Sequence, residues 1–353
     1  MSQTLLEVND VEAHFQLGRG ILGRSRGVVR AVNGVSLRIS QGQTLGLVGE
    51  SGCGKSTLGR CIVGLERPTA GVVRFDGQPV GASADATKRR RVQMIFQDPY
   101  ASLNPRMTAG EIVAEPIRLH NLRSGAAVQK RMRELLGLVE LLPSAADQYP
   151  HEFSGGQRQR IGIARALACE PDLIVCDEPV SALDVSIQAQ VMRLLCRLQV
   201  DLGITYLFIG HELGVVRAVS DEIAVMYLGQ IVEQAESSAL FHQPRHAYTR
   251  ALISAAPIPD PALERTRARI LLSGDPPNPM ALPPGCPFSS RCPVAIPLCG
   301  RERPPLVLAG RDDPNHTVAC WRADEMPALL PLITDRVAVV AGPSPGALIN
   351  TTE

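Results

Sequence analysis

A surplus of charge of one sign and long apolar runs are both missing from this sequence. Its 353 residues carry 36 Lys and Arg against 35 Asp and Glu, a formal net charge of +1. Neutralising the phosphates of a nucleic acid takes a clear surplus of basic residues, so this balance argues against a nucleic-acid-binding protein. No run of 18 uninterrupted apolar residues exists, which argues against a segment that spans a bilayer by itself.

The N-terminal residues do not show the pattern expected of a leader sequence, and lysine is scarce. The first twenty residues mix acidic and polar residues throughout and lack the apolar centre of a signal peptide. We therefore expect the chain to stay where it is made, in a reducing compartment where its nine cysteines do not form disulfides. Only three lysines occur, Lys55, Lys88 and Lys130. In a chain that otherwise uses arginine, each of them is a candidate for a special role.

Apolar, strand-like runs alternate with helix-like segments from residue 8 to about residue 234. The pattern predicts strands at 44–48, 92–96, 173–177 and 204–209, and a hairpin of 222–227 and 230–233 joined through Leu228-Gly229. It predicts helices at 55–64, 109–119, 126–141, 157–168 and 187–200. Apolar strands interleaved with helices indicate an α/β core with a mostly parallel sheet.

The composition changes after about Pro244. Prolines crowd residues 257–305, and four of the nine cysteines lie between residues 286 and 320. We therefore expect one large domain at 1–243, a small Cys- and Pro-rich module at 244–330, and a partly disordered tail at 331–353.

A glycine-rich segment follows the strand predicted at 44–48. Gly49-Glu-Ser-Gly-Cys-Gly-Lys-Ser56 fits the pattern G-x-x-x-x-G-K-[ST] and stands between a strand and a helix. Glycines let such a loop wrap around phosphates with its N–H groups pointing inward, and the helix N-terminus adds positive potential. We predict a nucleotide site in which Lys55 reaches the β- and γ-phosphates and Ser56 binds Mg²⁺. The expected binding residues are Gly49, Ser51, Gly52, Cys53, Gly54, Lys55, Ser56 and Thr57.

Two adjacent acids end the strand predicted at 173–177. In Leu173-Ile-Val-Cys-Asp177-Glu178, an apolar strand delivers two carboxylates to one crevice. We expect Asp177 to hold Mg²⁺ through water, and Glu178 to orient and deprotonate an attacking water. By itself such an ending is equally typical of a cap on the following helix.

Ser154-Gly155-Gly156-Gln157 precedes the acidic strand. Ser154 and the two glycine amides stand at a predicted helix start, which suits an anion, although a capped surface helix has the same pattern. In this order and spacing, the segment resembles the signature of ATP-binding-cassette (ABC) ATPases. That resemblance implies a P-loop cassette with a RecA-like core, an antiparallel β subdomain and an α-helical subdomain at about 98–160. It also implies that residues 154–157 bind the γ-phosphate held by the opposite subunit of a dimer.

Other positions also match this family. Gln97 resembles the residue whose amide senses Mg²⁺ and the γ-phosphate, and His211 resembles the switch histidine that contacts the γ-phosphate. Asp184, in Ser181-Ala-Leu-Asp184, lies in what resembles the loop linking the two subunits. Phe15, in a region without a clear period, is the best match for the aromatic residue that stacks on adenine.

Three longer segments resemble the ATPase subunits of dipeptide and oligopeptide importers, closest to the subunit lettered F. They are Phe96-Gln-Asp-Pro-Tyr-Ala-Ser-Leu-Asn-Pro105, Asp177-Glu-Pro-Val-Ser-Ala-Leu-Asp184 and Pro244-Arg-His-Ala-Tyr-Thr249. The resemblance implies a subunit at the cytoplasmic face of the membrane that powers peptide import with ATP and Mg²⁺. Its implied partners are two transmembrane permease subunits, a homologous second ATPase and, indirectly, an extracytoplasmic peptide-binding protein, with no nucleic acid.

Cys286, Cys292, Cys299 and Cys320 lie in a loop-rich segment that buries too little surface to hold its own shape. A bound metal would supply the stabilisation that this small core lacks. Four thiolates suit either tetrahedral Zn²⁺ or a four-iron cluster. The resemblance to peptide-importer ATPases favours a [4Fe–4S] cluster. The spacing lacks the C-x-x-C knuckles of zinc ribbons, and four free thiols are the remaining alternative.

The leading prediction is therefore an ATP-hydrolysing subunit of a dipeptide or oligopeptide importer. A soluble cassette ATPase of nucleic-acid repair or translation is one alternative; such proteins usually carry two cassettes or basic arms, which this chain lacks. An importer ATPase for nickel or glutathione is another, because the substrate is chosen by the permease and the binding protein. A regulatory subunit that binds ATP without hydrolysing it is disfavoured by the presence of Glu178.

Overall fold

A mixed sheet of eight strands lies at the centre of the computed structural model, which describes residues 3–18, 27–80, 86–256, 265, 269–310 and 315–330. Its strands are β3 (Thr44–Val48), β6 (Val92–Ile95), β7 (Leu173–Asp177), β8 (Thr205–Gly210), β9 (Glu222–Tyr227), β10 (Gln230–Glu236), β11 (Val307–Leu308) and β12 (Thr317–Val318). They are ordered β11-β12-β10-β9-β3-β8-β7-β6. The five strands from β9 to β6 pair in parallel, and β10, β12 and β11 add antiparallel pairs at one edge.

The central strands are buried on both faces. All five residues of β7 are buried, with Leu173 and Val175 in one hydrophobic core and Ile174 and Cys176 in the other. A strand covered on both sides has no polar alternation, which is why it reads as a continuous apolar run. Its carboxyl end therefore delivers Asp177 and Glu178 to the edge of a closed core.

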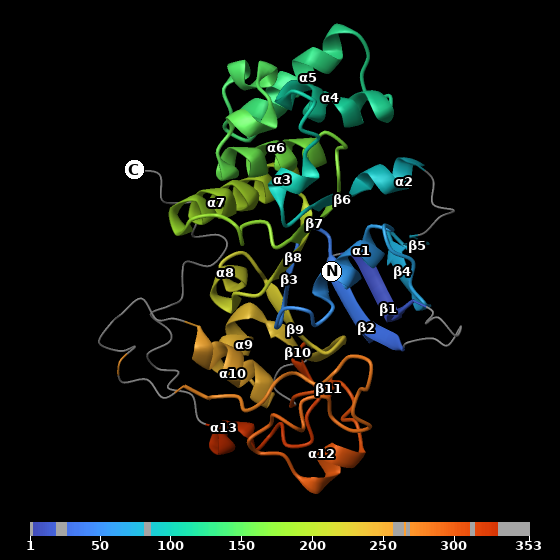
Figure 1. Cartoon of the computed structure of the whole chain (residues 1–353), viewed down its shortest axis with the longest axis vertical. Helices are drawn as coiled ribbons and strands as arrows, with labels where there is room; N and C mark the ends of the chain where they lie inside the picture. The colour runs from blue at the N-terminus through green and yellow to red at the C-terminus, as the bar shows by residue number, and fades with distance from the viewer. Residues whose placement is uncertain are drawn as a thin grey trace.

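A smaller antiparallel sheet covers one side of the central sheet. It consists of β1 (Thr4–Gln16), β2 (Val28–Ser40), β4 (Ala70–Phe75) and β5 (Gln78–Pro79), in the order β2-β1-β4-β5. Helix α1 (Lys55–Ile62) lies beside this sheet in Figure 1, and its Leu58 and Ile62 share a core with Leu6 and Val8 of β1. The helix that follows the phosphate loop is thus held between two sheets.

Helices form a separate layer at the upper end of Figure 1. In chain order they and their neighbours are α2 (Ala86–Arg91), α3 (Pro99–Ser102), α4 (Ala109–Leu119), α5 (Ala126–Leu138), the 3₁₀ turns η1 (Pro143–Asp147) and η2 (Pro150–Glu152), α6 (Gly155–Leu167) and α7 (Val185–Leu202). Helix α4 starts at a capping box in which Thr108 accepts from the N–H of Glu111 while Glu111 accepts from that of Thr108. Such a cap contributes about 1 kcal/mol to helix stability.

The C-terminal residues complete the edge of the central sheet. They follow α8 (Leu213–Arg217), α9 (Ser237–His242) and α10 (Ala247–Ala255), and they contain the short helices α12 (Pro297–Arg301) and α13 (Met326–Leu329). Strand β12 pairs with β10 through Glu233↔Val318 and Gln234↔Thr317. The lower part of Figure 1 therefore shares backbone hydrogen bonds with the sheet that carries the phosphate loop.

The predicted α/β fold with a parallel core is confirmed, and the predicted strands and hairpin are present with ends shifted by at most three residues. Two helices end earlier than predicted, at Ile62 and Leu138. Helix α6 starts at Gly155 rather than at residue 157, because Ser154 caps it, and α7 extends to 185–202. The placement of Phe15 in an irregular region is wrong, because it lies in β1 opposite Val29. The tail expected at 331–353 lies outside the described residues.

Among the helices that the structure describes, none is both long enough and apolar enough to cross a membrane.

Candidate functional site

The loop from Gly49 to Lys55 connects β3 to α1 and turns sharply at Gly54. Gly54 is the residue before the helix and has a φ of 106°, a conformation that favours glycine. A β-carbon at this position would lie 1.9 Å from the carbonyl oxygen of Ala31 on β2. The loop can therefore take this shape only with glycine at position 54.

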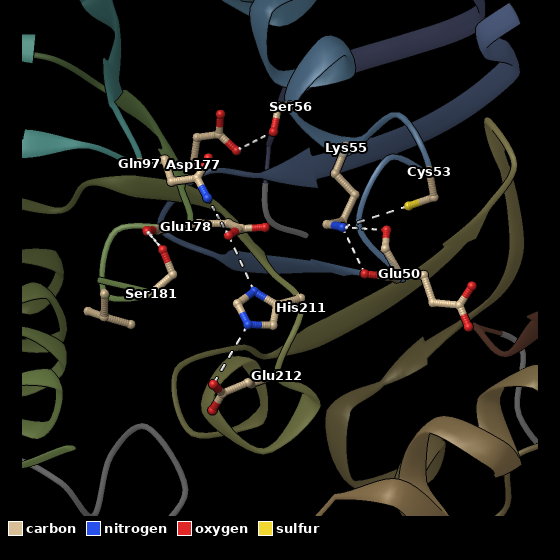
Figure 2. A network of polar contacts seen from close by, with 12 residues as sticks. Glu50, Cys53, Lys55, Ser56, Gln97, Asp177, Glu178, Ser181, His211 and Glu212 are labelled. Carbon is tan, nitrogen blue, oxygen red and sulfur yellow. Dashed lines mark hydrogen bonds and ion pairs between the residues drawn. The ribbon is translucent and has the colours of Figure 1, made fainter. Parts of the chain in front are cut away.

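Lys55 is 4% exposed, and the carbonyl groups of its own loop hold its ammonium group. Its Nζ donates to the carbonyl oxygens of Gly49 at 2.7 Å and Glu50 at 3.0 Å, and it lies 3.7 Å from Sγ of Cys53 (Figure 2). The loop thus encloses the cation at the start of a helix, where the backbone also favours negative charge. An arginine fork would not fit this ring of close acceptors.

Ser56 and Asp177 lie together on the other side of the loop. The Ser56 hydroxyl donates to Oδ1 of Asp177 at 2.8 Å, which joins the first turn of α1 to the end of β7. Burial raises the pKa of the Asp177 carboxyl above its ordinary value, and the hydrogen bond from Ser56 only partly lowers it. A hydroxyl beside a buried carboxylate is the oxygen donor set that Mg²⁺ prefers, and a cation there would favour the charged form.

Glu178 is the centre of a second group of polar contacts. Its Oε2 accepts from the Gln97 amide at 2.8 Å and lies 3.3 Å from Nδ1 of His211. Its backbone has a φ of 46°, and its N–H donates to the carbonyl of Ile209 on β8. The ends of β6, β7 and β8 therefore bring an amide, a carboxylate and an imidazole to one point.

His211 and Ser181 complete the network in Figure 2. The other ring nitrogen of His211 lies 3.7 Å from Glu212, and the His211 side chain is 45% exposed. The Ser181 hydroxyl donates to the backbone carbonyl of Glu178 at 3.1 Å. Glu178 is thus largely enclosed while His211 faces outward, an arrangement in which an approaching group meets the imidazole first.

Three sets of predicted site residues lie away from this network. Ser154 and Gln157 form a reciprocal cap at the start of α6, in the helical layer of Figure 1, with contacts of 3.0 and 3.3 Å. Asp184 precedes α7 and is exposed, and Phe15 at the end of β1 is 37% exposed. Within the described part of the chain, no hydrogen bond or ion pair joins any of these residues to the loop of Lys55.

Four cysteines of the C-terminal segment line one small cavity of about 20 Å³, with His246, Phe288 and Met326 among their neighbours. Burial raises the pKa of Cys286 to about 11 and that of Cys320 to about 12, and it raises the pKa of Cys292 as well. In the described residues no group of three or more His, Cys, Asp or Glu side chains is close enough to hold a metal ion. The cysteines therefore share a cavity, and the predicted cluster stays a prediction.

The sequence prediction missed a contact between the C-terminal segment and the phosphate loop. Arg291 binds the carboxylate of Glu50, and the Tyr248 hydroxyl accepts from the backbone N–H of Glu50. Glu50 occupies one of the unspecified positions of the loop pattern, so the pattern gives no reason to select it. The available signal was an isolated arginine beside a cysteine, in Phe288-Ser-Ser-Arg291-Cys292.

This arrangement can bind and hydrolyse a phosphate anhydride. The loop offers N–H groups and Lys55 for phosphates, Ser56 and Asp177 suit a divalent cation, and Glu178 can accept a proton from water. All of them lie at the carboxyl ends of parallel strands, where ligands bind in open α/β sheets.

Comparisons with known proteins agree with this geometry. Residues 32–181 match the family described as ABC transporter, and residues 232–299 match the family described as oligopeptide/dipeptide transporter, C-terminal region. The chain is 50% identical to the oligopeptide transport ATP-binding protein OppF of Escherichia coli, over 92% of this chain and 98% of that protein. It is 49% identical to AppF of Bacillus subtilis, over 90% of this chain and 97% of that protein.

Solved structures show the same fold. The dimeric, post-hydrolysis structure of the ATP-binding cassette MJ0796, bound to ADP and phosphate, matches with a TM-score of 0.59 at 30% identity, covering 66% of this chain and 99% of that one. The cassette cbiO1 of Clostridium perfringens matches with a TM-score of 0.58 at 26% identity, covering 68% and 91%.

Proposed function

Because this chain belongs to the ABC transporter family, in the group of oligopeptide transport ATP-binding proteins, we propose that its ATPase activity powers an importer of oligopeptides or dipeptides. The observation that carries this proposal is the convergence of the Lys55 loop, the Ser56–Asp177 pair and the Gln97–Glu178–His211 group at one end of the sheet.

Each residue of this convergence has a proposed role, which rests on the loop motif and the resemblance to ABC ATPases and is compatible with its contacts. The loop from Gly49 to Thr57 binds the phosphates, with Lys55 on the β- and γ-phosphates. Ser56, Asp177 and Gln97 would hold Mg²⁺, which supplies charge neutralisation at the transferred phosphate. Glu178 accepts the proton of the attacking water, and His211, exposed and 3.3 Å from Glu178, senses the γ-phosphate.

We propose that the remaining predicted residues act on the nucleotide of a second subunit. Ser154 and Gln157 are exposed and cap the N-terminus of the 13-residue helix α6, and Gly155 and Gly156 lie between them in the first turn. We propose that residues 154–157 bind the nucleotide held by a homologous second ATPase, with Asp184 in the loop between the subunits. Phe15 is proposed to stack on adenine, because its side chain is exposed at the end of β1.

We propose an assembly that is based on the same group membership. The proposed partners are two membrane-embedded permease subunits, with the helical stretch between Gln97 and Ser154 docked on them and the chain at the cytoplasmic face. A peptide-binding protein outside the membrane supplies the substrate. We further propose domain boundaries at 1–243 and 244–330.

Transport by a reconstituted importer tests this proposal. The chain would be purified from membranes with its co-purifying subunits and placed in proteoliposomes with ATP on its own side. Uptake of a labelled oligopeptide that requires ATP supports the proposal. Uptake of nickel or glutathione without peptide uptake would contradict the proposed substrate class, and a complex without permease subunits would contradict the importer.

We also propose that the cavity of Cys286, Cys292, Cys299 and Cys320 holds a [4Fe–4S] cluster, with Zn²⁺ as the alternative. The four cysteines line one cavity, and burial disfavours their bare thiolates, so a bound cation would stabilise them. The test is an iron, sulfide and zinc assay after anaerobic purification, together with an absorption spectrum. Colourless protein with stoichiometric zinc would contradict the cluster.

A further inference from the structure

The C-terminal segment reaches the phosphate loop through a buried arginine. Nη1 of Arg291 lies 2.8 and 3.1 Å from the two carboxylate oxygens of Glu50, the residue after Gly49. The Arg291 side chain is 9% exposed and that of Glu50 is 28% exposed. An ion pair this enclosed is screened less than one on the surface, so it can fix the position of the loop residue that it holds.

A tyrosine holds the backbone of the same loop residue. The N–H of Glu50 donates to the hydroxyl of Tyr248 on α10 at 2.8 Å. Tyr248 is fully buried, and its ring lies 4.7 Å from that of Tyr227 and 5.4 Å from that of Phe288, measured between centroids. Nη1 of Arg291 also lies 3.3 Å from the Tyr227 hydroxyl. One rigid aromatic group therefore supports both contacts to Glu50.

Glu50 in turn holds the lysine of the loop. Its carbonyl oxygen accepts from Nζ of Lys55 at 3.0 Å (Figure 2). With the contacts to Arg291 and Tyr248, the side chain, N–H and carbonyl of Glu50 are thus all hydrogen-bonded. The partners come from three parts of the chain: Arg291, Tyr248 and Lys55. A displacement of the C-terminal segment would therefore act on the lysine through a single intervening residue.

We propose that Arg291 and Tyr248 are positioning residues for nucleotide binding. They hold Glu50 so that the loop of Lys55 has its binding shape before a nucleotide arrives, and the C-terminal segment thereby sets the nucleotide affinity of this chain. The physical reason is preorganisation: a loop that is already ordered loses less conformational entropy on binding. This inference rests on the proposed nucleotide site and assigns a role to a segment outside the cassette.

Equilibrium binding of a fluorescent ATP analogue to the full chain tests the inference. Tyr248→Phe removes one hydroxyl and keeps the ring, and Arg291→Met removes the charge while keeping an unbranched side chain. Each is expected to raise the Kd by about fivefold or more, the lower end of ordinary coupling between sites. Arg291→Lys, which keeps the charge but loses the planar guanidinium, is expected to restore part of the affinity relative to Arg291→Met.

A double-mutant comparison separates positioning from folding. In a Glu50→Gln background, Arg291→Met should add little to the Kd, because the carboxylate through which it acts is gone. Arg322→Met is the matched control: Arg322 lies in the same segment and binds Glu325 and the carbonyl of Val294 rather than the loop. It should lower the unfolding midpoint without changing the Kd.

Three results would overturn the inference. They are an unchanged Kd in both Tyr248→Phe and Arg291→Met, an equal Kd increase in Arg322→Met, or an undiminished effect of Arg291→Met in the Glu50→Gln background. If the unaltered chain does not bind the analogue at all, the proposed function itself is contradicted, whereas a normal Kd in the variants contradicts only the positioning role.

Discussion

Gly54 shows how strictly a single position of the phosphate loop is constrained. Gly52 and Gly54 both have positive φ values, of 78° and 106°. A β-carbon on Gly52 would meet no atom within 4 Å, whereas one on Gly54 would collide with the backbone of Ala31. A side chain at Gly54 should therefore destabilise the fold more than one at Gly52, and the difference in the free energy of unfolding can be measured.

We expect Gly54→Ala to abolish nucleotide binding and to destabilise the chain by about 3 kcal/mol or more, since the loop must move away from β2. Gly52→Ala, the matched control, should cost only the strain of a positive φ, about 1 kcal/mol. Urea unfolding and nucleotide titration of both variants provide the comparison. Equal losses in the two variants would show that the close approach to Ala31 does not shape the loop.

At the scale of residues, short motifs predicted the groups that meet at the site. Lys55, Ser56, Asp177 and Glu178 could be named because each belongs to a local pattern beside a strand. The ion pair of Glu50 with Arg291 could not be predicted, because the two residues are 241 positions apart and local spacing does not encode such a pairing. Cys53 was predicted as a binding residue, and it lies buried beside the Lys55 ammonium group.

At the scale of elements, the strands that are buried on both faces were predicted correctly, and the strands of the smaller sheet were not. The strands β3, β7 and β8 are covered on both faces and read as apolar runs that are easily recognised. The β1–β2 pair is harder to recognise, because its register shifts at four places and the alternation of buried and exposed residues is interrupted. The strand containing Phe15 was missed for this reason.

His246, directly before helix α10, makes the stability of the folded chain depend on pH. His246 caps the helix by accepting from the N–H of Tyr248, and Glu233 and the ring of Phe288 lie against it. Burial lowers the pKa of His246 to about 4 from its ordinary value of 6.5. The folded chain therefore keeps the ring neutral while the unfolded chain takes up a proton, and stability is lost as the pH falls from about 6.5 towards 4.

We expect His246→Asn, which can still cap the helix, to make the pH dependence of unfolding shallower in this window. The difference in the free energy of unfolding between pH 7 and pH 4 should shrink by about 3 kcal/mol, since one unit of pKa corresponds to about 1.4 kcal/mol. Urea midpoints measured from pH 4 to 7.5 on both proteins give this value. Parallel curves would contradict a buried neutral ring.

At the scale of the whole molecule, the predicted site residues fall into two groups, those that contact one another within this chain and those that lie exposed on its surface. The loop, the acids and His211 meet within the chain, whereas Ser154 and Asp184 are exposed and contact none of them. In the dimer proposed above, residues 154–157 of the second ATPase would complete the nucleotide site of this chain. A relation between subunits could be proposed from the signature motif but not from contacts within one subunit.

Ser154→Ala should therefore impair the partner's site rather than this chain's own site. The measurement uses dimers with a second ATPase in which Lys55 of this chain is replaced and the partner's loop lysine is intact. In these dimers we expect Ser154→Ala to lower hydrolysis at the partner's loop by about tenfold or more. Thr108→Ala removes a similar cap from α4 and should leave that rate unchanged. A defect confined to this chain's own loop would contradict the shared site.

The central claim is that this chain hydrolyses ATP with Glu178 as the base. The most direct measurement compares ATP binding and phosphate release in the unaltered chain and in Glu178→Gln, each paired with a second ATPase whose loop lysine has been replaced. We predict that the variant binds ATP as well as the unaltered chain, accumulates as an ATP-bound dimer, and releases phosphate at least about 100-fold more slowly. Undiminished phosphate release by Glu178→Gln would contradict this account.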